Sequence, residues 1–436
     1  MSATTIGLIG LLAFFLLIAL KMPISFAMLL TGLIGFCVLT SVPAGLQMVT
    51  TEIFNTFTSH SLSVIAMYVW MGYLAYHSGI GTNLYIFAYK MIGHVPGGLA
   101  VASQLACAIF GAVCGSNTAT AATMGAIAIP EMKKYGYDDS LSTASIAAGG
   151  ALAALIPPSV IFIVYGMSTG QSIGKLFIAG IIPGIMLMSL YIIAILIITH
   201  RDNSLAPKGP KASWKERIES LKEGLGETLL IFSLSIGGLF LGWFTPTEAG
   251  AIGAGGVLLI TALRKKMDFN KLRQSLADTT RNTAMIMMLI AGAVVFGRFM
   301  AISRIPFMLA DWSSSLPLHP YAIFGVVVLI YMILGCFIDA LALVLLTVPI
   351  FEPVVVGTLG YDPIWFGVIV VLVVAMGVIT PPVGMNVYII KGVAKDVPLE
   401  TIFKGIWPFL LCVLICITIL VAFPPLVMLL PNLLIS

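Results

Sequence analysis

The chain has 436 residues, of which 59% are hydrophobic and 9% are charged, and its formal net charge is +4. Its mean hydropathy is +1.08. This composition excludes an ordinary soluble domain. It predicts an all-α polytopic protein whose surroundings are a lipid bilayer and not a nucleic acid.

The polar chemistry of the chain narrows its function further. The six cysteines all lie in apolar stretches, and the five histidines form no cluster with metal-ligand spacing. We therefore expect no disulfide, no transition metal and no other cofactor. An intramembrane enzyme would need a nucleophile with a base, or a metal site. Neither pattern occurs, so we expect no enzyme.

Apolar stretches of about twenty residues begin near the N-terminus, at 4–20, 23–42 and 60–78. The first stretch lacks a basic n-region and a small-residue cleavage site, so we interpret it as a retained helix and not as a signal peptide. Over the whole chain, about ten crossings plus shorter re-entrant pieces fit the pattern.

Residues 96–134 are apolar except near their middle, where the chain reads Gly115-Ser116-Asn117-Thr118-Ala119-Thr120. Glycine permits a tight reversal, and hydroxyl and amide side chains satisfy freed backbone groups or face a ligand. We predict a re-entrant helical hairpin with its tip at these residues. The alternative is a single kinked helix whose Ser and Thr hydroxyls bond back to its own carbonyls.

A Pro-Pro pair interrupts two further apolar stretches. Gly136-Tyr137-Asp138 is followed, after eighteen mostly apolar residues, by Pro157-Pro158, and the pattern recurs 224 residues later from Gly360 to Pro382. Proline lacks an amide N–H and clashes with the carbonyl of residue i−4. We predict broken transmembrane helices at about 140–168 and 362–392. The carbonyls that lose their helical donors belong to Ala153, Ala154, Gly377 and Val378.

This recurrence indicates an internal repeat, 1–200 and 226–436, in which Pro23 matches Pro246 and Gly79 matches Gly297. The connector 201–225 mixes basic and acidic residues, which predicts an amphipathic surface segment. Each half makes five net crossings if its hairpin re-enters. An odd count places the second half upside down relative to the first, as in inverted-repeat transporters.

The basic residues support one orientation. With the N-terminus outside, all of the 22 Lys and Arg residues except Lys175, Arg298 and Arg304 fall on the cytoplasmic side. The connector then lies in the cytoplasm and both termini lie outside. This count depends on re-entrant hairpins at 96–134 and 320–355.

The second predicted hairpin, 320–355, has its tip at Gly335-Cys336-Phe337-Ile338-Asp339. A carboxylate at such a tip is costly unless it is paired, solvated or close to a cation, so a functional role is the first interpretation. The second is a structural acid held by helix N-terminal amides.

The two tips and the two breaks together predict two cation sites around one anion site. Hard oxygen ligands suit Na⁺ or another hard cation, and helix N-termini suit an anion such as a carboxylate. Arg298 either contacts a substrate carboxylate or reaches the outer headgroups. The residues predicted to contact the substrate are Asn117, Thr118, Asp339, Thr380, Asn386 and Arg298.

Several motifs resemble one known family. They are the 115–120 tip, Ile129-Pro130-Glu131-Met132, Ile156-Pro157-Pro158-Ser159, Phe244-Thr245-Pro246-Thr247-Glu248-Ala249 and Thr380-Pro381-Pro382-Val383-Gly384. Together they resemble the large membrane subunit of tripartite ATP-independent periplasmic (TRAP) transporters, over nearly the whole chain.

The resemblance implies an elevator-type, Na⁺-coupled importer of an organic acid, a C4-dicarboxylate or a sugar acid such as sialic acid. It would lie in a bacterial inner membrane with both termini periplasmic. Its implied partners are a small four-helix membrane subunit, which we expect not to be fused to this chain, and a periplasmic binding protein. One Na⁺ would bind Ser116, Asn117, Ala153, Ile156 and Pro158, and the other Gly335, Asp339, Gly377, Thr380 and Val383.

Two other transport interpretations remain open. One is a stand-alone sodium-coupled carboxylate carrier or antiporter of the same superfamily. The other is a channel, although paired tips with a midplane acid fit alternating access better than an open pore.

Overall fold

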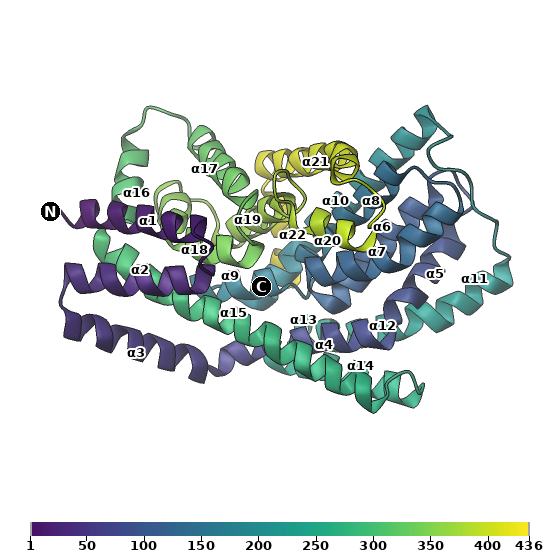
Figure 1. The fold of residues 1–436 in the computed structure, drawn as a ribbon, viewed down its shortest axis with the longest axis horizontal. Coiled ribbons are helices and arrows are strands. Elements are labelled where there is room, and N and C mark those ends of the chain that lie inside the picture. Colours follow the sequence, from purple (N-terminus) through teal and green to yellow (C-terminus); the bar gives the residue numbers. More distant parts are fainter. Residues whose placement is uncertain (1, 435–436) are drawn as a thin grey trace.

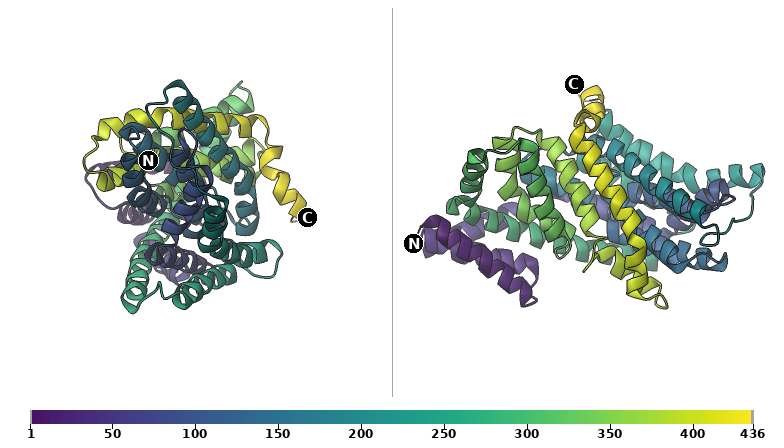
Figure 2. Two further views of the ribbon diagram at one scale, coloured as in Figure 1. Left: turned by 90° about the vertical axis from the view of Figure 1, so that its right-hand side faces the viewer. Right: turned by 90° about the horizontal axis from the view of Figure 1, so that it is seen from above.

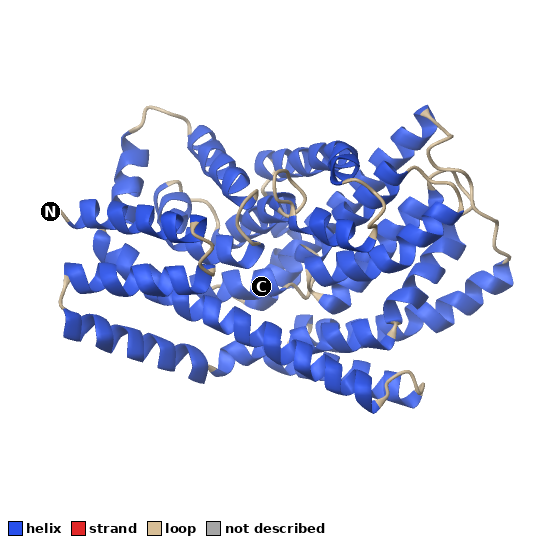
Figure 3. Ribbon diagram, in the orientation of Figure 1, coloured by secondary structure: helices blue, strands red, loops and turns tan. Residues whose placement is uncertain are grey.

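The structure is a computed structural model that describes residues 2–434, apart from the side chains of 223 and 224. Every regular element in this range is a helix, so the prediction of an all-α fold is confirmed (Figure 3). The molecule is elongated, with the N-terminus at one end of its long axis (Figure 1).

Five helices precede the first predicted hairpin, and serine caps begin two of them. The hydroxyls of Ser2 and Ser41 accept amide hydrogen bonds of 3.1 and 3.4 Å from the first turns of α1 and α3. Two of the helices, α3 and α5, lie outside the predicted spans. The bounds are α1 (Ala3–Ala19), α2 (Ile24–Leu39), α3 (Val42–Thr58), α4 (Ser63–Ser78, after the 3₁₀ turn η1, His60–Leu62) and α5 (Ile80–Ile92).

The first predicted hairpin is a pair of helices, α6 and α7, that pack against each other. It is therefore not a single kinked helix. The first broken helix follows as α8, a 3₁₀ turn and α9. The bounds are α6 (Gly98–Cys114), α7 (Asn117–Lys134), α8 (Asp139–Ala151), η2 (Leu152–Ala154), α9 (Val160–Thr169) and α10 (Ile173–Arg201).

The connector contains one short helix, α11, which begins with a capping box between Ser213 and Glu216. The elements from here to the second hairpin include three-residue α13 and the 35-residue α15. The bounds are α11 (Trp214–Ser220), the π-helical η3 (Leu221–Leu225), α12 (Gly226–Phe232), the π-helical η4 (Ser233–Gly237), α13 (Gly238–Phe240), α14 (Pro246–Leu263), α15 (Phe269–Ser303) and α16 (Ile305–Ser315).

The last third of the chain contains the second predicted hairpin, the second broken helix and two closing helices. The bounds are α17 (Pro320–Gly335), α18 (Ala340–Glu352), the π-helical η5 (Pro353–Thr358), α19 (Pro363–Gly377), α20 (Met385–Val393), α21 (Leu399–Ala422) and α22 (Pro425–Leu434).

The two Gly-Tyr-Asp motifs have the same local role. Gly136 and Gly360 adopt φ values of +74° and +72°, which glycine tolerates best. Asp138 then caps α8 by accepting a 3.0 Å hydrogen bond from the Leu141 amide, and Asp362 caps α19 from the Ile364 amide at 2.8 Å. Both motifs therefore start the helix that the Pro-Pro pair later ends.

One sequence match needs correction. Gly79, with φ of +77°, separates α4 from α5, whereas Gly297 lies inside the uninterrupted helix α15. The left-handed residue that separates α15 from α16 is Arg304, with φ of +62°. The backbone counterpart of Gly79 is therefore Arg304, because each adopts the left-handed conformation between two consecutive helices.

Five helical segments have both the length and the apolar composition to span a bilayer: α10, α14, α15, α18 with η5, and α21. The other apolar helices are shorter, with 10–17 residues. A helix of about 16 residues rises about 24 Å, less than the hydrocarbon thickness of about 30 Å. Several predicted crossings, α1 and α2 among them, are therefore shorter than the hydrocarbon layer. Residues 340–358, most of which fall in the predicted re-entrant hairpin 320–355, are long enough to cross on their own.

The helices pack in two groups. The scaffold group consists of α1–α4 and α12–α15, in which α15 lies against α2, α3 and α4 and α14 lies against α4 (Figure 1). The hairpin group consists of α6–α10 and α17–α21, in which α18 packs on α9, α20 on α7 and α21 on α8. Helices from the two halves of the sequence thus form each group, and the C-terminal helices cross over those of the first half (Figure 2).

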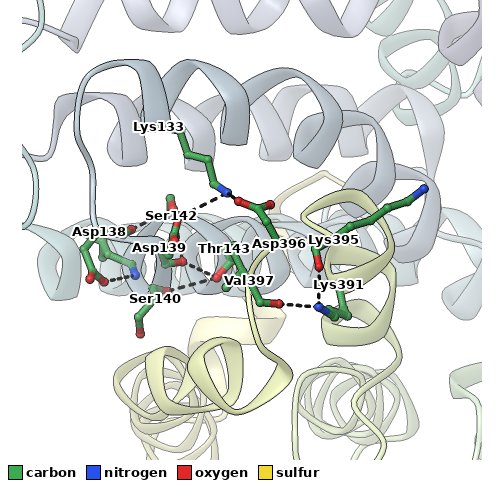
Figure 4. Close-up of polar contacts among 11 residues, drawn as sticks. Lys133, Asp138, Asp139, Ser140, Ser142, Thr143, Lys391, Lys395, Asp396 and Val397 are labelled. Carbon is green, nitrogen blue, oxygen red and sulfur yellow. Dashed lines mark hydrogen bonds and ion pairs between the residues drawn. The ribbon is translucent and has the colours of Figure 1, made fainter.

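Polar contacts fasten the two halves of the hairpin group at one end. The Lys133 ammonium, on the last turn of α7, contacts the carboxylate of Asp396 and lies 3.5 Å from that of Asp139 (Figure 4). Lys391 donates 2.8 Å hydrogen bonds to the carbonyls of Lys395 and Val397, which holds the loop that carries Asp396. The hydrogen bond from Lys133 lowers the pKa of Asp396.

Candidate functional site

A cavity of about 450 Å³ lies between the two groups, and both predicted tips line it. The hairpin group contributes residues 114–119 and 339–342, and the scaffold group contributes parts of α2, α4 and α15. Among the described residues that line the cavity, Asp339 is the only charged one. The remaining polar lining residues are Ser25, Tyr73, Ser116, Asn117, Thr118 and Asn282.

The first tip is a tight reversal with a capped helix start. Gly115 ends α6 with φ of +64°, and the Ser116 hydroxyl accepts a 3.4 Å hydrogen bond from the Ala119 amide at the start of α7. The Ser116 and Thr118 hydroxyls lie 3.1 Å apart. Asn117 is buried, and its Oδ1 has no hydrogen-bond partner within residues 2–434. An unpaired buried acceptor is a candidate ligand for a cation or a substrate donor.

The first tip packs on the first Pro-Pro break. A Cβ on Gly115 would lie 2.7 Å from the Pro158 carbonyl oxygen, and the Val160 amide donates to the Gly115 carbonyl at 3.5 Å. Ala153, fully buried, lies against Gly111 of α6. Three of the five residues predicted for the first cation site, Ser116, Ala153 and Pro158, thus belong to one junction of tip and break.

Ile156 faces a different neighbour. Its Cγ1 lies 2.9 Å from the position that a Cβ on Gly184 of α10 would occupy. The side chain therefore packs on α10, and only the Ile156 backbone remains available to the predicted cation site.

The second tip carries a carboxylate where the first carries a hydroxyl. Asp339 caps α18, and its Oδ2 accepts a 3.1 Å hydrogen bond from the Leu341 amide. Its side chain is exposed to the cavity and not enclosed in the packing. The interpretation of Asp339 as a helix cap is therefore confirmed, and its functional role stays a prediction.

The second tip lies against the second break at a similar distance. A Cβ on Gly377 would lie 2.7 Å from the Gly335 carbonyl oxygen. A separate cavity of about 20 Å³ is lined by Gly335, Asp339, Gly377 and Val383 among others. Such a volume holds about one water molecule or one cation of similar size. Asp339 lines this small cavity as well as the large one.

The Gly377 and Val378 carbonyls at the second break accept hydrogen bonds from other amides. The Thr380 amide donates to the Gly377 carbonyl at 3.1 Å, and the Asn386 amide donates to the Val378 carbonyl at 2.9 Å. Our expectation that these carbonyls lose their helical donors holds because residues i+4 are prolines, but they are not bare. Each carbonyl oxygen still has a second lone pair for a cation.

Three residues predicted to contact the substrate do not line either cavity. The Thr380 hydroxyl donates back to the Met376 carbonyl at 2.7 Å. Asn386 is fully buried, and its amide nitrogen donates to the Ala147 carbonyl of α8 at 3.0 Å. Arg298 pairs with Glu52 of α3, with 2.7 Å between Nε and Oε1, an alternative that the sequence did not indicate.

The scaffold wall of the large cavity was missed by sequence reasoning. Ser25, Tyr73 and Asn282 line it from α2, α4 and α15. Asn282 is a polar residue at the start of an apolar run, which is the one local signal that marks any of them. Their convergence depends on helix packing between residues more than 200 positions apart.

The fold is that of an all-helical polytopic membrane protein. A crystal structure of the YdaH transporter of Alcanivorax borkumensis is similar over 88% of this chain and 90% of that one, with a TM-score of 0.60. The sequence identity is 14%, so the likeness establishes the fold alone.

The family follows from the sequence comparisons. The family model described as the tripartite ATP-independent periplasmic transporter, DctM component, matches residues 11–426. The C4-dicarboxylate TRAP large permease of Pseudomonas aeruginosa is 34% identical, with 89% of this chain and 90% of that one covered. The sialic acid TRAP large permease of Vibrio cholerae is 33% identical, with 94% and 95% covered. The chain belongs to the DctM family of TRAP transporter large permeases, whose members in these comparisons are transporter subunits and not enzymes.

Proposed function

We propose that this permease imports an organic acid by coupling it to Na⁺, with one cation at each junction of tip and break. The observation that carries the proposal is the convergence of both tips on one cavity, with a second, cation-sized cavity beside Asp339. The alternative of a stand-alone carrier is not favoured by the family match.

Oxygen ligands support the cation sites. At the first junction these are the Ser116 hydroxyl, the unpaired Asn117 Oδ1 and carbonyls of residues 153, 156 and 158. At the second they are the Asp339 carboxylate and carbonyls of residues 335, 377 and 383, which surround the small cavity. Hard oxygens without a thiolate or imidazole suit Na⁺ better than a transition metal.

The large cavity suits the carboxylate of an organic acid. The capped N-termini of α7 and α18 both reach it, and helix N-termini attract anions. Thr118, exposed at the first tip, and Asn117 supply neutral polar groups for the rest of the substrate. The two relatives carry a C4-dicarboxylate and sialic acid, and we extend that range of acids to this chain.

The packing supports the proposed elevator motion. Both tips belong to the hairpin group, and the opposite wall belongs to the scaffold group, so movement of one group along the other would carry a bound substrate. The reciprocal contacts of α2 with α15 and of α4 with α14 support the inverted repeat.

The present conformation is inward-facing on the predicted orientation. The cavity reaches the first turn of α2, at residues 23–25, and the middle parts of α4 and α15. The first turn of α2 adjoins Lys21, which the positive-inside pattern places in the cytoplasm.

Membership of a tripartite family implies two partners. One is a small membrane subunit and the other a periplasmic binding protein, which delivers the acid to this permease in the inner membrane. Both termini are proposed to lie in the periplasm.

The test is reconstitution of the chain in proteoliposomes with its small subunit and binding protein. Uptake of labelled succinate or N-acetylneuraminate should require an inward Na⁺ gradient, and an equal K⁺ gradient should not replace it. Uptake without the binding protein would support the stand-alone carrier instead. Uptake that ignores Na⁺ would refute the coupling.

A further inference from the structure

A second polar cluster lies on the scaffold wall beside the large cavity. It consists of Tyr73 and His77 on α4 and Asp278, Arg281 and Asn282 on α15. The His77 Nε2 and Asp278 Oδ2 atoms lie 2.9 Å apart, and the rings of Tyr73 and His77 stack with their centroids 6.4 Å apart. Two of the five, Tyr73 and Asn282, line the cavity.

Arg281 is left without a carboxylate partner in the part of the chain that the structure describes. Asp278 lies three residues earlier on the same helix, a spacing at which Asp and Arg commonly pair. His77 engages Asp278 instead. His77 thus binds Asp278, the acid of α15 nearest in sequence to Arg281, and the exposed Arg281 guanidinium remains free.

Arg281 lies close to the cavity without being part of its lining. It precedes the lining residue Asn282, and it lies four residues before the lining residue Met285, a spacing that places Arg281 and Met285 on the same face of α15. The cavity lining among the described residues contains one acid, Asp339, and no Lys, Arg or His. No basic side chain among these lining residues therefore competes with Arg281 for an anion.

We propose that Arg281 binds the carboxylate of the transported acid at the cytoplasmic mouth of the cavity. The inference rests on the proposed function and its inward-facing orientation. A guanidinium offers paired N–H donors that match a carboxylate bidentately. His77 acts as a positioning residue, because it keeps Asp278 from neutralising Arg281.

The experiment measures inhibition of uptake by acid inside the vesicles, which rebinds the inward-facing state. Proteoliposomes of the full complex are loaded with unlabelled succinate or N-acetylneuraminate, and uptake of the same labelled acid is followed. Arg281→Gln should raise the internal concentration for half-inhibition about tenfold, the effect of about 1.4 kcal/mol, and leave external half-saturation within about twofold. Arg281→Lys should raise the internal concentration for half-inhibition by less than Arg281→Gln does, because the positive charge remains.

Two further variants separate binding from folding. Arg273→Gln, which removes an exposed charge from the same helix two turns earlier, should leave the internal half-inhibition unchanged. His77→Ala should shift it in the same direction as Arg281→Gln, because Asp278 is released. Adding Asp278→Asn to His77→Ala should reverse that shift.

The outcomes discriminate between the two proposals. If wild-type uptake is Na⁺-dependent but Arg281→Gln behaves like Arg273→Gln, the role of Arg281 is refuted and the proposed function stands. Equal shifts of internal and external constants would also refute it, since a general structural defect acts on both sides. If the wild-type protein shows no Na⁺-dependent uptake, the proposed function fails, and the inference fails with it.

Discussion

The two hairpin tips use one backbone device and two different chemistries. Each tip reverses beside a helix that a Pro-Pro pair has broken, and each capping side chain faces the large cavity. The first tip caps its helix with the neutral Ser116, and the second with the charged Asp339. A carboxylate binds a cation more strongly than a hydroxyl does. Two tips with the same backbone arrangement can therefore differ in how strongly they bind a cation.

The tips also differ in how tightly the backbone is enclosed. At the first tip a left-handed glycine, Gly115, approaches the Pro158 carbonyl. At the second, Gly335 and Gly377 approach each other directly, and the small cavity lies beside them. The second junction therefore depends on two glycines, one from the hairpin and one from the broken helix.

The strongest test of the comparison is Asp339→Asn. We expect the Na⁺ concentration for half-maximal uptake to rise at least about tenfold, because a charge-assisted contact is worth about 1.5–3 kcal/mol. The measurement is the Na⁺ dependence of uptake in proteoliposomes. Asp311→Asn, which neutralises an exposed acid on α16 outside both cavities, is the matched control. An unaltered Na⁺ dependence in Asp339→Asn would place the cation elsewhere.

The next effect in size concerns the glycine pair. Gly377→Ala would place a Cβ 2.7 Å from the Gly335 carbonyl oxygen, so the tip must move away from the break. Overpacking of this kind costs about 1–3 kcal/mol of stability, and we expect uptake to fall about tenfold. Thermal unfolding in detergent and uptake are measured together.

The control for that variant is Gly392→Ala on α20, where nothing lies within 4 Å of the added Cβ. It should retain full uptake and gain about 0.5–1 kcal/mol of helix stability. A Gly377→Ala protein with normal uptake would show that the contact of the two glycines is not needed for transport.

A smaller effect is expected at the first tip. Ser116→Ala removes a helix cap worth about 1 kcal/mol and one hydroxyl ligand of the proposed cation. Uptake should persist with a Na⁺ requirement raised about threefold, less than for Asp339→Asn, because the lost ligand is neutral. Ser172→Ala removes an equivalent cap from α10, where the hydroxyl accepts from the Lys175 amide at 3.3 Å, outside both cavities. If Ser116→Ala had the larger effect, the proposed ranking of the two sites would be reversed.

The smallest effect concerns the contact that fastens the two halves. Asp396→Asn should lower the Tm slightly and leave uptake unchanged, because exposed ion pairs contribute little. The hydrogen bond from Lys133 lowers the pKa of Asp396. The stabilising contribution is therefore present above the ordinary Asp value of about 3.9, and it is lost as the pH falls through the lower folded-state value. The Tm difference between wild type and variant should vanish in acid, and a difference that persists there would contradict the assignment.

The local features of the site were predictable because they depend on short stretches of chain. Pro157-Pro158 and Pro381-Pro382 end helices by removing donors, and the 115–120 segment reverses where glycine and small polar residues gather. Ser116, Asn117, Thr118 and Asp339 were therefore predicted to contact a cation or the substrate, and all four line one cavity in the structure.

The errors arose where the partner lies far away in sequence. Arg298 was assigned to substrate or headgroups, but Glu52, 246 positions away, pairs with it. Asn386 was assigned to substrate, but it joins α20 to the Ala147 carbonyl of α8, 239 positions away. A polar residue in an apolar helix signals that some partner exists, and the sequence does not identify which one.

The sequence by itself determined that this protein is an all-helical membrane protein of the DctM family, with two broken helices and two polar tips. These properties follow from hydropathy, proline chemistry and motif, all of which act within a few turns of chain. The tertiary structure alone decided that both tips meet at one cavity and that α2, α4 and α15 form its opposite wall. It also left Arg281 free beside that wall by pairing Asp278 with His77. The physical reason is that helix packing, which sets such contacts, depends on surfaces separated by some 200 residues of chain.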